Sequence, residues 1–242
     1  MIYVIFSDVH ANLEAFEAVL REFDDISPDR IICLGDIVGY GASPHKCIEI
    51  ARGLTDHIVA GNHDFGVVGL TDIQYFNSIA RAAIHWTAAR ITSEDKEFLK
   101  SLPLVYREQG KLRAVHASPS QPAMWHYIFT PHQALAEFKH FDEPICFIGH
   151  SHQAAIYELI DEHTVRAVQE SIEIRQGRRY MINVGSVGQP RDFDPRACFC
   201  VYDSERGRIH FRRVAYDIAT AQEKIVQAGL PPVLATRLSW GE

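Results

Sequence analysis

The chain has 242 residues, of which 47% are hydrophobic and 23% are charged. These proportions are those of an ordinary globular protein and exclude the disordered, collagen-like and disulfide-dense classes. The formal net charge of −7 disfavours a basic binding surface, so we expect neither double-stranded nucleic acid nor a membrane as a partner. Thirteen histidines are unusual for this length, and histidine is the commonest metal ligand.

The cysteines and the N-terminal residues indicate a reducing compartment. The five cysteines form no Cys-x-x-Cys pair, and Cys33 and Cys146 lie within apolar runs, so we expect buried thiols. The opening residues, MIYVIFSDVH, lack the basic region of a signal peptide. No apolar run approaches the roughly 18 residues that a membrane span needs. We therefore expect a cytoplasmic protein.

Residues 1–60 alternate between strand and helix patterns. Helices are predicted where apolar residues recur at helical spacing, and strands where short apolar runs end at a glycine. The predicted order is strand 1–7, helix 12–23, strand 31–34, helix 44–52 and strand 58–60. This alternation predicts a parallel sheet with right-handed crossovers.

The rest of the chain is helical in the middle and rich in short strands toward its end. Helices are predicted over 73–91, 94–101, 131–140 and 217–228, and strands over 104–108, 111–115 and 145–148. Six later strands are predicted to form a mostly antiparallel sheet, at 154–160, 164–168, 171–174, 180–184, 197–202 and 208–214. Because we find no linker or repeat, we expect one domain over 1–242.

Polar side chains follow five of the predicted strands, at the edge where α/β sheets bind ligands. Seven of them are oxygen or imidazole donors: Asp8, His10, Asp36, Asn62, His116, His150 and His152. Seven ligands are too many for one tetrahedral zinc. They suit two divalent ions about 3.5–4 Å apart that share one carboxylate, an arrangement used for hydrolysis at phosphorus. The alternation in His150-x-His152 predicts that both imidazoles lie on one side of extended backbone.

The motifs around these donors resemble those of the calcineurin-like metallophosphoesterases, in particular the small prokaryotic phosphoesterases. The motifs follow the family's order: SDVHAN (7–12), GDIVGYG (35–41), GNHD (61–64), HASP (116–119), GHSH (149–152) and the Gly-rich NVGSVGQPRD (183–192). The resemblance implies an α/β fold, a four-layer α/β/β/α sandwich with two mixed β-sheets. The metal-ligand motifs would lie within 7–152, and second-sheet strands and C-terminal helices within 154–242.

The resemblance also implies a role for each donor. One ion would be held by Asp8, His10 and His152, the other by Asn62, His116 and His150, with Asp36 bridging them. Mixed nitrogen and oxygen ligation fits two divalent transition-metal ions, with Mn²⁺ expected first and iron, zinc, cobalt or nickel also compatible. A hydroxide bridging the ions would attack phosphorus in a small-molecule phosphomonoester or phosphodiester.

His63 is the catalytic residue that the resemblance implies. It would not be a metal ligand but would face the leaving oxygen of the scissile phosphate. There it could stabilise the developing charge or donate a proton.

Departures from related patterns narrow the substrate. Tyr40 and Gly39 stand where protein serine/threonine phosphatases carry arginine and aspartate, and symmetrical diadenosine tetraphosphatases also carry the arginine. Since tyrosine cannot grip phosphate bidentately, both activities are disfavoured. Arg191 is a candidate cation for the phosphate or a solvated loop residue, and Tyr40 and Asn12 are further candidate substrate contacts. For Asn12, a helix N-cap is the competing interpretation.

Other functions stay open at this point. Trp125, His126 and Tyr127 could stack on a base or aryl leaving group, or pack in the core. A catalytically silent scaffold is one alternative, but all seven ligand positions and His63 are intact, which favours an enzyme. A nuclease or dinucleoside polyphosphate hydrolase is another, and the short acidic chain weighs against a nuclease. The C-terminal helix leaves a homo-oligomer open.

Overall fold

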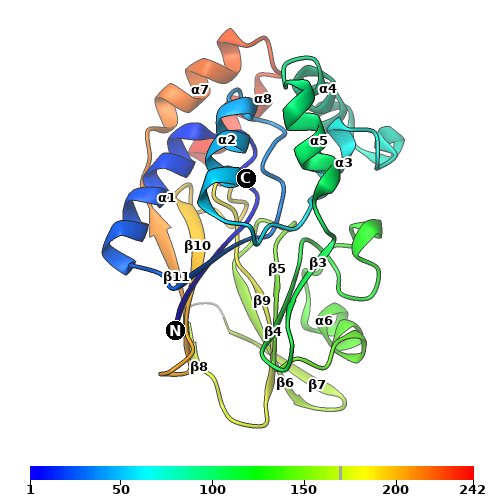
Figure 1. Ribbon diagram of the computed structural model, residues 1–242, viewed down its shortest axis with the longest axis vertical. Helices are drawn as coiled ribbons and strands as arrows, with labels where there is room; N and C mark the ends of the chain where they lie inside the picture. The colour runs from blue at the N-terminus through cyan, green and yellow to red at the C-terminus, as the bar shows by residue number, and fades with distance from the viewer. Residues whose placement is uncertain (169–170) are drawn as a thin grey trace.

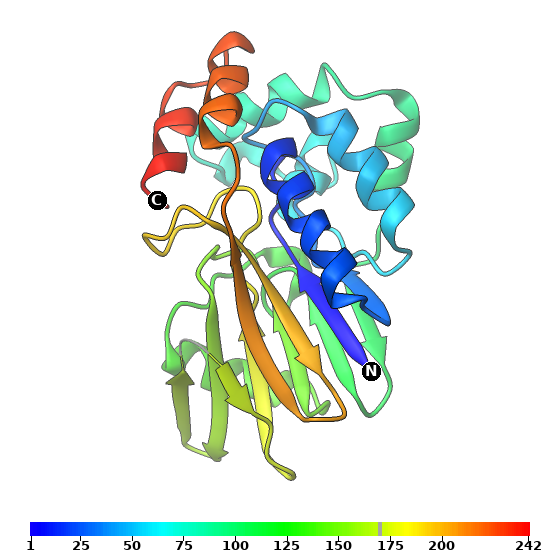
Figure 2. The same ribbon diagram turned by 90° about the vertical axis from the view of Figure 1, so that its left-hand side faces the viewer.

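Both faces of the N-terminal strand β1 (Ile2–Phe6) are covered, which places it between two layers of the protein. Its side chains alternate between two apolar clusters. Tyr3 and Ile5 pack toward a second sheet, whereas Val4 and Phe6 pack toward helices. The computed structural model describes residues 1–168 and 171–242, and Figures 1 and 2 show the two sheets with helices outside them.

The first sheet has the strand order β2-β1-β10-β11-β8. Its other strands are β2 (Arg30–Cys33), β8 (Ser171–Glu173), β10 (Ala197–Asp203) and β11 (Arg208–Val214). Strand β1 is parallel to β2 and antiparallel to β10. This sheet is therefore mixed.

The second sheet has the order β3-β4-β5-β9-β6-β7. Its strands are β3 (Val105–Glu108), β4 (Leu112–Val115), β5 (Ile145–Ile148), β6 (Ala155–Asp161), β7 (Thr164–Val168) and β9 (Arg179–Asn183). The three central strands β4, β5 and β9 are parallel, and the outer pairs are antiparallel. This sheet is mixed as well.

Helices cover the outer face of each sheet and complete the four layers (Figure 1). Apolar faces of α1 and α2 join the core of the first sheet, and α6 packs on the second sheet. The helices are α1 (Leu13–Ile26), α2 (Pro44–Leu54), α3 (Asn62–Val67), α4 (Ser78–Ala88), α5 (Ser93–Ser101), α6 (Pro131–Glu137), α7 (Ile218–Gln227) and α8 (Val233–Thr236). The predicted α/β/β/α sandwich is confirmed. Among the described residues, no helix is both long enough and apolar enough to cross a bilayer.

Two of the predicted elements differ from the structure. Residues 58–60 form a single bridge, between Cys33 and Ile58, because the Ala60 N–H leaves the ladder to bond the carbonyl of Pro103. The helix predicted over 73–91 is divided into a 3₁₀ turn, Ile73–Tyr75, and α4, which begins after its N-cap Asn77.

The later strands do not form one sheet. β8, β10 and β11 extend the first sheet, whereas β6, β7 and β9 extend the second. Hairpin spacing predicts that strands consecutive in the sequence pair with each other. It does not predict that β9 pairs with β5 in parallel or that β10 pairs with β1.

Candidate metal centre

Strands from both sheets end at the same edge, and their following residues converge there. Asp8 follows β1, Asp36 follows β2, His116 follows β4, and His150 follows β5. All seven predicted donors are buried, with exposed fractions of 6% or less. The fold thus brings together residues separated by 144 positions in the chain, from Asp8 to His152.

The donors form two compact groups. Asp8, His10 and His152 make one, and Asp36, His116 and His150 make the other, with the ligand atoms of each group within 4.8 Å of one another. Asn62 joins the second group, since its Oδ1 is 3.2 Å from His116 Nε2.

Asp36 lies between the two groups. Its Oδ2 is 3.6 Å from Nε2 of His10 and 3.4 Å from Nε2 of His116. One carboxylate oxygen therefore faces an imidazole of each group, as a shared ligand would.

Hydrogen bonding in the first group leaves lone pairs facing one another. Nδ1 of His10 lies 3.1 Å from the carbonyl of Val38, and Nδ1 of His152 lies 2.5 Å from that of Gln189. A carbonyl only accepts, so each Nδ1 carries the proton and each Nε2 presents a lone pair. The two Nε2 atoms are nevertheless only 3.0 Å apart.

A divalent cation fits this arrangement. Asp8 Oδ1 is 3.2 Å from Nε2 of His152 and accepts no hydrogen bond from the part of the chain that the structure describes. Three electron-rich atoms converge with no proton between them, and imidazoles fixed by backbone carbonyls are typical of metal sites. Nδ1 of His116 likewise bonds the carbonyl of Leu34, at 2.7 Å, and aims its Nε2 into the second group.

Burial and the carboxylates act in opposite directions on these groups. Burial lowers the pKa of His150 to about 3. Burial also disfavours the charged form of His116, but the carboxylates of Asp36 and Asp8 raise its pKa to about 9. Burial would raise the pKa of Asp36, yet the nearby imidazoles of His116 and His63 hold it well below its usual range. The centre therefore favours positive charge between its carboxylates.

His63 lies beside both groups, at the start of α3. Its backbone N–H donates to Asp36 Oδ1 at 2.8 Å, and its Nδ1 has no hydrogen-bond partner among residues 1–168 and 171–242. Burial lowers its pKa to about 4. The His63 ring also forms a close group with His10 and Asp36, so proximity alone does not separate a ligand from a residue that contacts substrate.

Strained backbone accompanies the ligands. Asp8, His10, Asp36, His150 and His152 all have φ between 49° and 66°, a left-handed conformation that non-glycine residues rarely adopt and that clusters at functional sites. The expected extended backbone at His150-x-His152 is therefore wrong. The two imidazoles reach different groups because the chain turns at each residue.

Glycines allow the close approach of these loops. A Cβ at Gly61 would lie 2.0 Å from Asp36 Oδ1, and one at Gly149 would lie 2.2 Å from Ser7 Oγ. A larger residue at Gly61 would therefore displace Asp36, and one at Gly149 would displace the chain at Ser7, next to Asp8.

The loop after β9 braces the centre. The backbone N–H groups of Val187 and Gly188 bond the carbonyls of Ser7 and Asp8, and Ser186 Oγ also donates to Asp8 O. These N–H groups are therefore engaged and cannot cradle an anion. The sequence motif 183–192 marked the loop, but its bracing role depends on distant partners.

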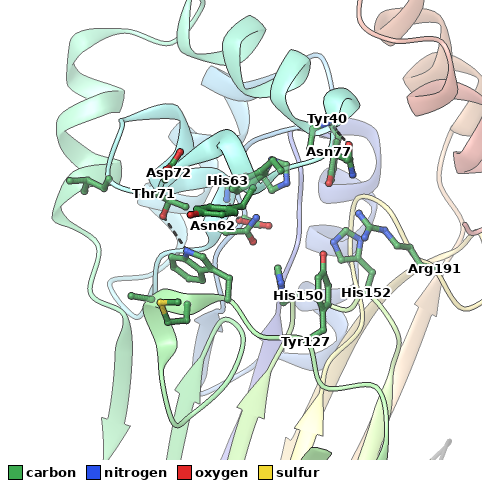
Figure 3. Close-up of a pocket in the computed structure, with 18 residues that line it drawn as sticks. Tyr40, Asn62, His63, Thr71, Asp72, Asn77, Tyr127, His150, His152 and Arg191 are labelled. Carbon is green, nitrogen blue, oxygen red and sulfur yellow. Dashed lines mark hydrogen bonds between the residues drawn. The ribbon is translucent and has the colours of Figure 1, made fainter.

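The metal-ligand groups form one end of a cleft of about 650 Å³. Figure 3 shows Asn62 and His63 facing Tyr127 and Arg191 across it. Tyr40 and Arg191 also line this cleft, and their contact with a substrate stays a prediction. Arg191 is held by Gln189 Oε1 at 2.8 Å, and burial raises the pKa of Tyr40, so its hydroxyl stays protonated.

Arg237 is a neighbour of this cleft that the sequence did not indicate. Its Nη1 donates to Gln189 Oε1 at 3.2 Å, the same oxygen that holds Arg191. It belongs to the C-terminal segment, about 45 positions beyond the last motif, so no local pattern marks it.

Asn12 is not a lining residue of the cleft. Its Oδ1 accepts the N–H of Ala15 at 3.1 Å and its Nδ2 donates to the carbonyl of Gly188 at 2.8 Å. Both ends of the amide are used within the protein, so we do not retain Asn12 as a substrate contact. It is the N-cap of α1.

We expect Asn12→Ala to lower the free energy of unfolding by about 0.5–2 kcal/mol, the usual effect of losing a cap. KM for any hydrolysed phosphate ester should not change. Denaturant unfolding and steady-state kinetics check both. Thr130→Ala, which removes the side-chain cap of α6, is the matched control, and a raised KM in Asn12→Ala alone would restore a substrate role for Asn12.

Comparison with known proteins agrees with this geometry. A protein of Methanocaldococcus jannaschii is 43% identical over 244 residues, which cover 100% of this chain and 98% of that protein. The crystal structure of a metallophosphoesterase from Sphaerobacter thermophilus superimposes with a TM-score of 0.87 and 40% identity over 100% of both chains. A Pyrococcus horikoshii protein shares the fold at 18% identity, with a TM-score of 0.81 over 100% of this chain and 98% of that one.

The sequence profile of the calcineurin-like phosphoesterase superfamily domain matches residues 1–207. That range contains every metal-ligand candidate and both sheets except β11. The chain therefore belongs to the calcineurin-like phosphoesterase superfamily.

Proposed function

We propose that the protein is a metal-dependent hydrolase of a small-molecule phosphomonoester or phosphodiester, working with two divalent transition-metal ions. The position of Asp36 carries this proposal, because its Oδ2 faces His10 on one side and His116 on the other at similar distances. Asp8, His10 and His152 would hold one ion, and Asn62, His116 and His150 the other.

When bound, such an ion pair neutralises phosphate oxygens and activates water for attack on phosphorus. The side chains around the metal centre would orient the phosphate ester and the His63 imidazole. Arg191 places a guanidinium at the cleft, where it can pair with a phosphate oxygen. Tyr40 packs against His63 with tilted rings whose centroids are 4.4 Å apart, and so fixes that imidazole beside Asp36.

His63 would contact the leaving oxygen of the ester. The His63 ring lines the cleft, its Nδ1 has no hydrogen-bond partner among the described residues, and its backbone N–H is anchored to Asp36. A donor held there stabilises the charge that develops as the ester bond breaks.

We also propose the cytoplasm as the compartment. All five cysteines are free and buried, as expected for a protein kept in a reducing environment. Manganese is the first candidate for the metal, and mixed imidazole, carboxylate and amide ligation is also compatible with iron, zinc, cobalt or nickel.

Metal removal tests the proposed function. Protein supplied with Mn²⁺ should hydrolyse p-nitrophenyl phosphate or bis(p-nitrophenyl) phosphate, and EDTA should abolish the release of nitrophenolate. Adding back Mn²⁺, Fe²⁺, Zn²⁺, Co²⁺ or Ni²⁺ should restore it, and elemental analysis should find two ions per chain.

EDTA already saturated with Mn²⁺ is the control for effects other than chelation. Turnover that persists after complete metal removal would contradict the metal-dependent mechanism. A fully loaded protein that hydrolyses no mono-, di- or dinucleoside polyphosphate ester would instead favour a scaffold.

A further inference from the structure

The cleft extends well beyond the metal-ligand groups. Its far part is built by the segment between α3 and α4 and by the loop after β4 (Figure 3). We call its lining the apolar wall, which consists of Leu70, Tyr75, Phe76, Met124 and Trp125. None of these five residues belongs to the metal-ligand groups, so the wall is available to the rest of the ester.

The apolar wall is exposed in a way that core residues are not. The exposed fractions of Tyr75, Met124 and Leu70 are 90%, 60% and 55%. Large apolar side chains gathered at the rim of one cleft mark a ligand-binding surface more often than single exposed residues do. The wall therefore fits an apolar part of a ligand.

Trp125 is held in place by its neighbours. Its Nε1–H donates to Thr71 Oγ1 at 3.1 Å, and its ring packs edge-on against Phe65 and His116 with centroids 6.0 and 5.9 Å away. An indole fixed before binding loses little freedom when a ligand stacks on it. Its contact with His116 also joins the wall directly to the metal centre.

The wall begins beside the catalytic candidate. Phe76 packs edge-on against His63, with ring centroids 5.4 Å apart. If His63 faces the leaving oxygen, the group attached to that oxygen extends over Phe76 toward Tyr75 and Leu70. The wall therefore lies on the leaving-group side of the scissile bond.

We propose that the apolar wall binds an aromatic ring in the leaving group of the phosphate ester. This inference rests on the proposed function and names its substrate class, an ester of an aryl or heteroaryl alcohol or of an alcohol that bears such a ring. A ring is favoured over an alkyl chain because Tyr75 and Trp125 offer flat faces, and aromatic pairs gain free energy beyond their buried area.

Binding of phosphonates to the Mn²⁺-loaded protein tests the ring preference without turnover. Three compounds carry the same phosphonate group. Benzylphosphonate adds an aromatic ring, cyclohexylmethylphosphonate adds a saturated ring, and methylphosphonate has no ring. By calorimetry, the benzyl compound should bind on the order of tenfold tighter than the methyl compound. It should also bind about two- to tenfold tighter than the cyclohexyl compound.

Two variants locate the effect. Tyr75→Ala removes a side chain that is 90% exposed, so the fold should tolerate it, and Trp125→Leu removes the fixed indole. Each should reduce the benzyl-to-methyl ratio by at least about threefold. Trp240→Ala, at an exposed tryptophan outside the cleft lining, should preserve the ratio.

The outcomes separate this inference from the proposed function. Equal affinity for benzyl- and methylphosphonate, or a ring preference untouched by both variants, would overturn the ring site while ester hydrolysis stands. A loaded protein that binds no phosphonate and hydrolyses no ester would overturn both.

Discussion

His63→Ala is expected to lower kcat for ester hydrolysis by about 10²–10⁴-fold while the protein still binds two metal ions per chain. The imidazole lines the cleft beside Asp36, and its Nδ1 bonds no other described residue. Removing a donor to the leaving oxygen affects the transition state more than it affects binding of the ground state, so kcat should fall more than KM rises. Steady-state kinetics and elemental analysis measure the two effects.

The result also decides between two roles that proximity leaves open. His63 forms a group with His10 and Asp36 in which the ligand atoms lie within 4.8 Å of one another. If His63 were a ligand, its loss would reduce the metal content to about one ion per chain. His85→Ala makes the same substitution at an exposed histidine of α4 and should change neither quantity.

Part of the donor set was predictable from the order of strands along the chain. Each ligand follows a short apolar run that the periodicity identifies, and parallel strands share a carboxyl edge. Asp8 and Asp36 lie at the ends of the adjacent parallel strands β1 and β2. The placement of His116 and His150 beside them required the two sheets to pack face to face, which the family resemblance supplied and local pattern did not.

Features set by tertiary contact were not predictable. Helix α3 begins at Asn62 because the Asp64 carboxylate accepts the N–H groups of Gly61 and Val38, and the latter lies in another loop. The N–H groups of Val187 and Gly188 are similarly occupied by the strand end at Ser7 and Asp8. In both cases local sequence does not indicate the contact, because the partner is distant in the chain.

The apolar wall shows the same limit. Trp125 and Tyr127 could be read from sequence as either core or stacking residues, and the cleft geometry favours the second. The exposed Tyr75, however, belongs to a segment predicted as continuous helix. Asn77 caps α4 at this point and the chain turns into a 3₁₀ segment instead, which places Tyr75 at the rim.

Asp36→Asn is expected to remove metal from both groups together. The substitution preserves shape, and the amide oxygen can still accept the N–H of His63 that Asp36 Oδ1 accepts. The new NH₂, however, would stand where Oδ2 faces Nε2 of His10 and of His116. Donors in that position satisfy both imidazoles without a cation, so the variant stabilises the metal-free protein as well as losing a ligand.

The expected magnitude follows from the role of a shared ligand. Losing a residue that only supports a metal ligand typically costs about 10–100-fold in affinity, so losing the bridging carboxylate should cost at least about 100-fold at each site. Titration with Mn²⁺ should then show two weakened sites and no detectable turnover at metal concentrations that saturate the unmodified protein.

A matched control keeps the chemistry of the substitution constant. Asp217→Asn changes an exposed carboxylate that caps α7, and asparagine is an equally good cap, so metal affinity and turnover should stay unchanged. If Asp36→Asn weakened only one ion, Asp36 would be a ligand of one group rather than a bridge. Asp36 Oδ2 lies at nearly equal distances from Nε2 of His10 and Nε2 of His116, which favours the bridge. A carboxylate that binds a single ion would lie closer to the imidazole of that ion's group.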